Sequence, residues 1–123
     1  MKYAINIKNE IKENDFTAHY NLGNSLYKRK MYDEAKAEYE KAELHANSLS
    51  DKAAALYNLG NSHIEKNDSK KAAEYYKRAL KQDPYNEAIR KNYEIAMLKE
   101  KEKENQKKQQ GKSDGGGKDQ SKD

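Results

Sequence analysis

The chain has 123 residues, enough for one domain, with 34% hydrophobic residues and a formal net charge of +4. It contains no cysteine, which excludes disulfides and thiolate metal sites. No apolar run approaches the roughly 20 residues of a membrane span, so we expect a soluble chain that does not itself insert into a membrane.

The first residues are predicted to form an amphipathic helix. Tyr3, Ile7 and Ile11 recur every four residues with Ala4 beside them, which gives one apolar stripe on a helix. The apolar stripe of such a helix has to be buried against another helix. We therefore interpret residues 1–15 as the remnant of a preceding repeat that covers the first full one.

An identical hexapeptide then occurs twice. Residues 20–25 and 57–62 both read Tyr-Asn-Leu-Gly-Asn-Ser, a period of 37 residues. Three further identities fall at the same offset: Ala35 with Ala72, Tyr39 with Tyr76, and Ala42 with Ala79. Self-similarity this regular indicates a repeat protein.

Each copy is predicted to be a helical hairpin. Apolar residues return at three and four positions in both halves of the copy, and turn signals separate the halves at residues 30–32 and 67–69. Asp15 and Asp68 are suitable N-caps, and Ser50 or Asp51 can cap the third helix. The expected helices span residues 16–29, 33–46, 52–66 and 69–82, with Pro84 preventing continuation of the last.

Gly23 and Gly60 occupy the middle of the first helix of each hairpin. Glycine there costs about 1 kcal/mol relative to alanine. We expect close approach of the two helices to offset this cost, with each glycine facing Ala35 or Ala72.

These offsets, Leu-Gly followed by a large residue and then Ala, Tyr, Ala and Pro84, resemble the tetratricopeptide repeat (TPR) over about residues 16–98. The first repeat departs from the pattern, with Asn47 at the place of the terminal proline, and both lack the early tryptophan. The resemblance implies an all-α, TPR-type helical-hairpin solenoid of two full repeats with an N-terminal helix and a C-terminal capping helix. The motif residues are Leu22, Gly23, Ala35, Tyr39, Ala42, Leu59, Gly60, Ala72, Tyr76, Ala79 and Pro84.

The final helix, capped by Asn86, is predicted to close the stack. Glu94 stands where the repeat would place glycine, so no further hairpin should pack there, and Lys91, Lys99 and Glu100 extend a polar outer face. Beyond Leu98 the Lys/Glu-rich sequence has no apolar face, so we expect fraying and then disorder. The predicted units are residues 1–15 (N-terminal helix), 16–49 and 50–86 (the two repeats), 87–104 (capping helix) and 105–123 (disordered polar tail).

Little in the chain points to catalysis or to ion binding. His19, His45 and His63 are spread over three predicted helices without paired ligand spacing, which predicts no metal site. Carboxylates alternate with lysines on exposed faces instead of pairing in a cleft. Residues 99–123 hold eight lysines and six acids, so half of the excess charge lies in the tail and no basic stripe suits nucleic acid. We expect neither an enzyme nor a cofactor.

The TPR resemblance implies a concave groove lined by the first helix of each hairpin, and we expect it to bind a peptide segment of another protein. Tyrosine rings offer apolar area, asparagine amides offer hydrogen bonds, and Lys91 favours acidic ligands. Binding on the convex side is the alternative. The predicted groove residues are Tyr20, Asn21, Asn24, Tyr27, Tyr57, Asn58, Asn61, Lys91, Asn92 and Ile95.

A narrower resemblance concerns TPR domains that clamp the carboxylate at the end of a peptide. Asn24 and Asn58 match the two asparagines of that clamp. Tyr20, Ala88 and Asn92 stand where its lysines and arginine belong. The clamp pattern is therefore only partly present.

The repeats, the segment Asp-Pro-Tyr-Asn-Glu-Ala at residues 83–88 and the polar tail together look like the TPR region of bacterial aerotolerance-operon (Bat) proteins. That resemblance implies a scaffold in a membrane-associated complex. The first ten residues lack the apolar segment of a signal peptide, and cytoplasm and periplasm both stay open. The alternatives are a self-associating repeat, as monomer or weak dimer, and a regulatory appendage of a longer chain that bears an enzyme or membrane domain.

Overall fold

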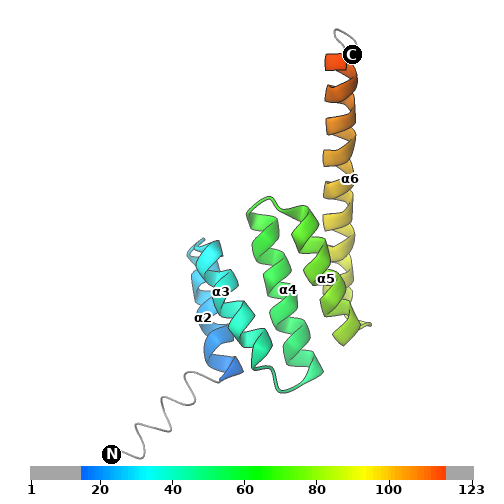
Figure 1. Cartoon of the computed structure of the whole chain (residues 1–123). Coiled ribbons are helices and arrows are strands. Elements are labelled where there is room, and N and C mark those ends of the chain that lie inside the picture. The colour runs from blue at the N-terminus through cyan, green and yellow to red at the C-terminus, as the bar shows by residue number, and fades with distance from the viewer. Residues whose placement is uncertain (1–14, 116–123) are drawn as a thin grey trace, which may run out of the picture.

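The computed structural model describes residues 15–115, with side chains through residue 111. This part of the chain is a row of helices in which each packs mainly against the next (Figure 1). They are α2 (Phe16–Lys28), α3 (Tyr32–Leu44), α4 (Leu49–Glu65), α5 (Ser69–Gln82) and α6 (Glu87–Gly115). The predicted all-α helical-hairpin solenoid is confirmed. The helix predicted at residues 1–15 and the end of the predicted tail lie almost wholly outside the described residues.

The core is built from small residues around large rings. The motif alanines Ala35, Ala42, Ala72 and Ala79 have no exposed surface, and Tyr39 and Tyr76 are each 1% exposed. Leu59 is also fully buried, because α4 lies between α3 and α5. Its counterpart Leu22 is 48% exposed, because among the described helices α2 packs mainly on α3.

The two mid-helix glycines face tyrosine rings and not the alanines we expected. A Cβ on Gly23 would lie 2.6 Å from Cε1 of Tyr39, and a Cβ on Gly60 would lie 2.6 Å from Cδ1 of Tyr76. The ring lies flat over the space that a side chain would occupy. Glycine is therefore required to admit the tyrosine of the second helix.

The three extra residues of the 37-residue period lengthen the start of α4. Ser48 Oγ accepts a hydrogen bond from the Asp51 amide at 3.0 Å, so Ser48 and not Ser50 or Asp51 is the N-cap, and α4 begins at Leu49. The predicted caps Asp15 and Asp68 are confirmed, because their carboxylates accept from amides of the first turns of α2 and α5.

The last helix is longer than the sequence suggested, since α6 continues to Gly115 instead of ending near residue 104. Tertiary contacts hold it as far as Lys103: Glu100 Oε1 accepts from Ser69 Oγ at 2.9 Å, and Lys103 Nζ donates to the Asn67 carbonyl at 2.6 Å. Glu100 thus contacts α5 and does not belong to the outer face. Lys, Glu and Gln are good helix formers and continue the helix beyond these contacts.

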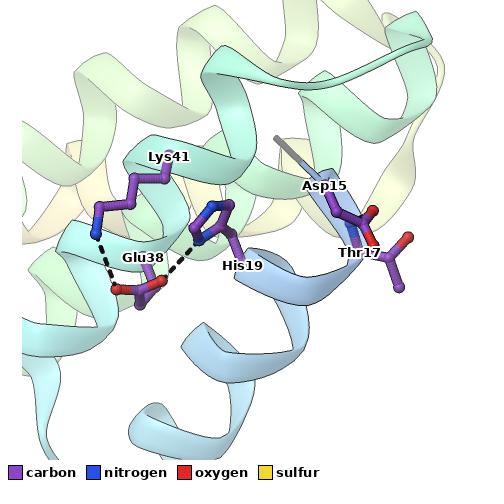
Figure 2. A network of polar contacts seen from close by, with 5 residues as sticks. All are labelled: Asp15, Thr17, His19, Glu38 and Lys41. Carbon is purple, nitrogen blue, oxygen red and sulfur yellow. Dashed lines mark hydrogen bonds and ion pairs between the residues drawn. The ribbon is translucent and has the colours of Figure 1, made fainter. Parts of the chain in front are cut away.

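The first hairpin is also closed by a polar network between α2 and α3 (Figure 2). Glu38 Oε1 lies 2.8 Å from His19 Nδ1, and Glu38 Oε2 lies 3.3 Å from Lys41 Nζ. Burial alone would raise the pKa of Glu38, but the hydrogen bonds from His19 and Lys41 outweigh it and lower that pKa. The His19 ring also stacks on His45, with centroids 6.1 Å apart.

Candidate functional site

Two clusters of tyrosine and asparagine side chains join successive hairpins. In the first amide cluster (Tyr20, Asn24, Tyr39 and Asn58), the Tyr39 hydroxyl donates to Asn24 Oδ1 at 2.6 Å. Asn58 Nδ2 of α4 then donates to the same oxygen at 3.3 Å and to the Tyr20 hydroxyl at 2.9 Å. The cluster therefore connects α2, α3 and α4.

The second amide cluster (Tyr57, Asn61, Tyr76 and Asn92) repeats this arrangement one hairpin later. The Tyr76 hydroxyl donates to Asn61 Oδ1 at 2.5 Å. Asn92 Nδ2 of α6 donates to Asn61 Oδ1 at 3.1 Å and to the Tyr57 hydroxyl at 3.0 Å. A longer bond of 3.4 Å from Asn61 Nδ2 to Asn58 Oδ1 links the two clusters.

Burial keeps the two core tyrosines in the donor form. It is the largest cause that raises the pKa of Tyr39 and of Tyr76. Both hydroxyls remain protonated through the physiological range and donate to asparagine oxygens. The asparagines of the amide clusters thus provide hydrogen-bond acceptors for the hydroxyls of two tyrosines whose rings are buried.

A pocket of about 330 Å³ opens beside the second amide cluster, between α2, α4 and α6. Its apolar walls are Ile64 and Ile95 together with the rings of Tyr27 and Tyr76. Glu65 supplies the charge among the lining residues. The full lining is Tyr27, Asn61, Ile64, Glu65, Tyr76, Asn92 and Ile95.

At the acidic end of this pocket, Glu65 accepts a hydrogen bond from a tyrosine. The Tyr27 hydroxyl of α2 donates to Glu65 Oε2 of α4 at 3.2 Å. Burial, and then the charge and hydrogen bond of Glu65, raise the pKa of Tyr27 to about 12. Tyr27 therefore stays a neutral donor, and the oxygens of Glu65 retain capacity to accept from a ligand.

Comparison with protein families assigns the repeat. A model described as tetratricopeptide repeat matches residues 14–84, more than half of the chain. The chain belongs to the TPR family. A comparison with curated proteins gave no match. TPR domains are generally protein–protein interaction modules and typically act as scaffolds without catalysis. The narrower Bat resemblance stays a prediction.

The matched segment ends within the turn before α6, so that this helix extends the TPR stack beyond the match. None of the described helices is long and apolar enough to cross a membrane. Over the same residues no group of three or more potential metal ligands occurs.

The predicted groove residues of this TPR stack divide into three groups. Tyr27, Asn61, Asn92 and Ile95 line the pocket. Outside its lining, Asn21 and Lys91 are exposed. Those whose hydrogen-bonding atoms join the amide clusters are Tyr20, Asn24, Tyr57 and Asn58, with Asn61 and Asn92 in both groups.

Three lining residues, Ile64, Glu65 and Tyr76, are not among the predicted groove residues. The sequence analysis assigned Tyr76 to the repeat motif as a packing residue. Tyr76 lines the pocket, and its hydroxyl donates to Asn61 Oδ1. Ile64 and Glu65 follow Asn61 on α4, and Glu65, four residues after Asn61, lies on the same helical face. That spacing was the available signal.

His63 lies on the other side of α4, away from the pocket lining. Its ring stacks on Tyr75 of α5 with centroids 5.2 Å apart, and its buried Nδ1 has no hydrogen-bond partner in the described structure. The nearest carboxylate oxygen, of Asp68, is 4.0 Å away. Burial first, and then the charge of Lys36, lowers the pKa of His63 below 6.5.

We therefore expect the TPR stack to lose stability between pH 7.5 and pH 5.5. As the pH falls through about 6.5 the unfolded chain binds a proton at residue 63 before the folded chain does, which favours unfolding. Urea unfolding at the two pH values measures the loss. His63→Gln should make the loss smaller, and an equal loss in both proteins would contradict this account.

Proposed function

We propose that the chain is an interaction scaffold that holds a peptide segment of a partner protein in the pocket between α2, α4 and α6. The observation that carries the proposal is the lining itself. Two isoleucines and two tyrosine rings surround a single carboxylate, Glu65. Apolar walls with convergent polar groups, here Glu65 and the side chains of Asn61 and Asn92, suit the binding of a peptide segment.

The size of the pocket limits what it accepts. About 330 Å³ is at the lower end of the range for ligand pockets, which suits one large side chain with its neighbouring backbone. The rest of the peptide would lie along α4 and α6. Because the contact is small, we expect a dissociation constant of about 1–100 µM.

The polar atoms favour a ligand that donates hydrogen bonds. Asn92 Nδ2 is occupied by Tyr57 and Asn61, so Asn92 Oδ1 is the amide atom that can accept from a peptide N–H. Glu65 is a second acceptor with a negative charge. We propose that the partner segment carries an apolar anchor next to a lysine or arginine, whereas the exposed Lys91 lies outside the pocket.

The test selects peptides from a random heptapeptide phage library on the immobilised full chain. The enriched sequences should combine an aromatic or aliphatic residue with an adjacent basic one. Synthetic versions are then titrated by fluorescence polarisation. We expect Glu65→Gln and Ile95→Asp each to weaken binding about tenfold at unchanged helicity.

Asn21→Ala and Lys91→Ala are matched controls, because both residues are exposed on helices of the TPR stack and lie outside the pocket lining. Both should bind like the unaltered chain. Selection of acidic peptides whose binding depends on Lys91 would contradict the proposed charge preference. Amide chemical shifts that change only on α3 and α5 would place the partner on the convex side and overturn the pocket proposal.

A further inference from the structure

One face of α6 exposes apolar side chains to solvent. Ile89 and Ala96 pack toward α5 and are 2% and 0% exposed. Met97 and Leu98 lie beside this contact, and they are 49% and 64% exposed. Figure 1 shows that α6 also extends beyond the ends of the other helices. Because Met97 and Leu98 are exposed beside the contact with α5, a second helix can lie along this face without displacing α5.

The charges around Met97 and Leu98 follow a two-fold pattern. Glu94 is three residues before Met97, and Lys101 is three residues after Leu98. Lys91 lies six residues before Met97, and Glu104 lies six residues after Leu98. Glu87 and Lys108 lie ten residues before Met97 and ten after Leu98, so that each such pair has opposite charges. All six charged residues are exposed, and positions spaced by three and four share one helical face.

We propose that two copies of the chain associate through this face, with their α6 helices antiparallel. Met97 of one copy packs on Leu98 of the second copy, and the reverse contact forms by symmetry. Each Glu94 then lies opposite Lys101 of the second copy. The outer pairs are Lys91 with Glu104 and Glu87 with Lys108, each formed twice.

The charge pattern selects this alignment. If the helices slid until the pair was centred on Lys99, Glu94 would oppose Glu104 and Arg90 would oppose Lys108. In a parallel pair in register, each charged residue would face the same residue of the second copy, and so a charge of the same sign. Both alternatives bring like charges together, which is destabilising across a contact. The antiparallel pair centred between Met97 and Leu98 has opposite charges at each of these places.

The contact is small, so the expected dimer is weak. Two apolar side chains from each copy give an interface well below the size of stable complexes, and exposed ion pairs contribute little individually. We expect a dissociation constant on the order of 0.1 mM at low salt. Added salt should weaken the dimer because it screens the pairs. None of these residues lines the peptide pocket, so the two proposals stand independently.

A charge exchange tests the pairing in the full chain by sedimentation velocity between about 10 µM and 1 mM. Glu94→Lys makes position 94 repel Lys101 of the second copy, and Lys101→Glu makes position 101 repel Glu94. Each single variant should dimerise about tenfold more weakly. In a mixture of the two variants every contact is again between opposite charges, so the heterodimer should regain the unaltered affinity.

Three outcomes of that experiment would overturn the proposal. One is a chain that stays monomeric up to 1 mM. Another is a pair of single variants that each associate as strongly as the unaltered chain. The third is a mixture that associates no better than either variant alone. Circular dichroism confirms that the variants keep their helicity.

The orientation is tested separately with a spin label at Gln110→Cys, which is the sole thiol because the chain has no cysteine. With a rise of 1.5 Å per residue, antiparallel α6 helices hold the two labels about 40 Å apart, whereas parallel helices hold them about 10 Å apart. The short distance would overturn the proposal.

The amphipathic sequence of residues 2–13 is the competing occupant of the α6 face. We expect the Ile7→Asp, Ile11→Asp chain to dimerise like the unaltered one. Loss of the dimer in that chain would assign the contact to the N-terminal segment and reject the helix pair.

Discussion

Gly60→Ala is expected to lower the free energy of unfolding by about 2 kcal/mol, although alanine is the better helix former. The added methyl group would lie 2.6 Å from Cδ1 of Tyr76, well inside contact distance. That ring cannot move aside at low cost, because it is 1% exposed and its hydroxyl is bound to Asn61. Overpacking of about 1–3 kcal/mol therefore outweighs a gain in propensity of about 1 kcal/mol.

Urea unfolding measures this loss, and Gly111→Ala is the matched control. Gly111 also lies in a helix, but a Cβ there meets nothing within 4 Å. We expect Gly111→Ala to leave the urea midpoint unchanged or to raise it. Gly60→Leu should cost more than Gly60→Ala, whereas Glu94→Ala, at the equivalent place on α6, should cost little. Equal losses at positions 60 and 94 would mean that ring packing is not the cause.

Asn61→Ala is expected to lower the free energy of unfolding by about 2 kcal/mol. Its Oδ1 accepts from the Tyr76 hydroxyl and from Asn92 Nδ2, so alanine leaves two donors of the second amide cluster without that acceptor. Unpaired donors in such partly buried places cost about 1–3 kcal/mol. Asn24→Ala should behave similarly in the first amide cluster.

Asn21→Ala provides the comparison, because Asn21 is an exposed asparagine of the same repeated hexapeptide. We expect a change within about 0.5 kcal/mol, as for most surface substitutions. A double-mutant cycle between Asn61→Ala and Tyr76→Phe measures the coupling directly. The double variant should lose less than the sum of the single losses, and simple additivity would show that the hydrogen bond contributes nothing.

These losses also decide how binding experiments are designed. The sequence analysis assigned Asn58 and Tyr57 to peptide contact, yet their polar atoms connect α4 to α2 and α6. Alanine at these positions would weaken the stack and binding together. Glu65 and Ile95 are better positions, because both line the pocket and neither belongs to an amide cluster.

Much of the fold follows from the sequence by itself. The identical hexapeptides, the alanine and tyrosine spacing and Pro84 determine the helical hairpins, the turns and the TPR family. The physical reason is that hydrophobic periodicity and capping are local, and the chain repeats them. The insertion was also visible as a 37-residue period, although only the structure shows that it lengthens α4 at Leu49.

Other features depend on contacts between residues distant in the chain, and only the tertiary structure decided them. The glycines face Tyr39 and Tyr76 and not alanines, because the direction of a side chain depends on how the two helices cross. Residues at the same position of the repeated hexapeptide also have different environments: Leu22 is half exposed, whereas Leu59 is buried. A helix has the same sequence whether one neighbour covers it or two, and its exposure is set by the stack.

The candidate site divides in the same way. The TPR resemblance indicated which helices would line a groove, and Tyr27, Asn61 and Ile95 lie on α2, α4 and α6. The sequence could not show which asparagine and tyrosine side chains bond between successive hairpins, since those bonds join residues 31–38 positions apart. Hydrogen bonds of that separation form only when the hairpins stack, so the stacking itself determined which polar groups remain for a ligand.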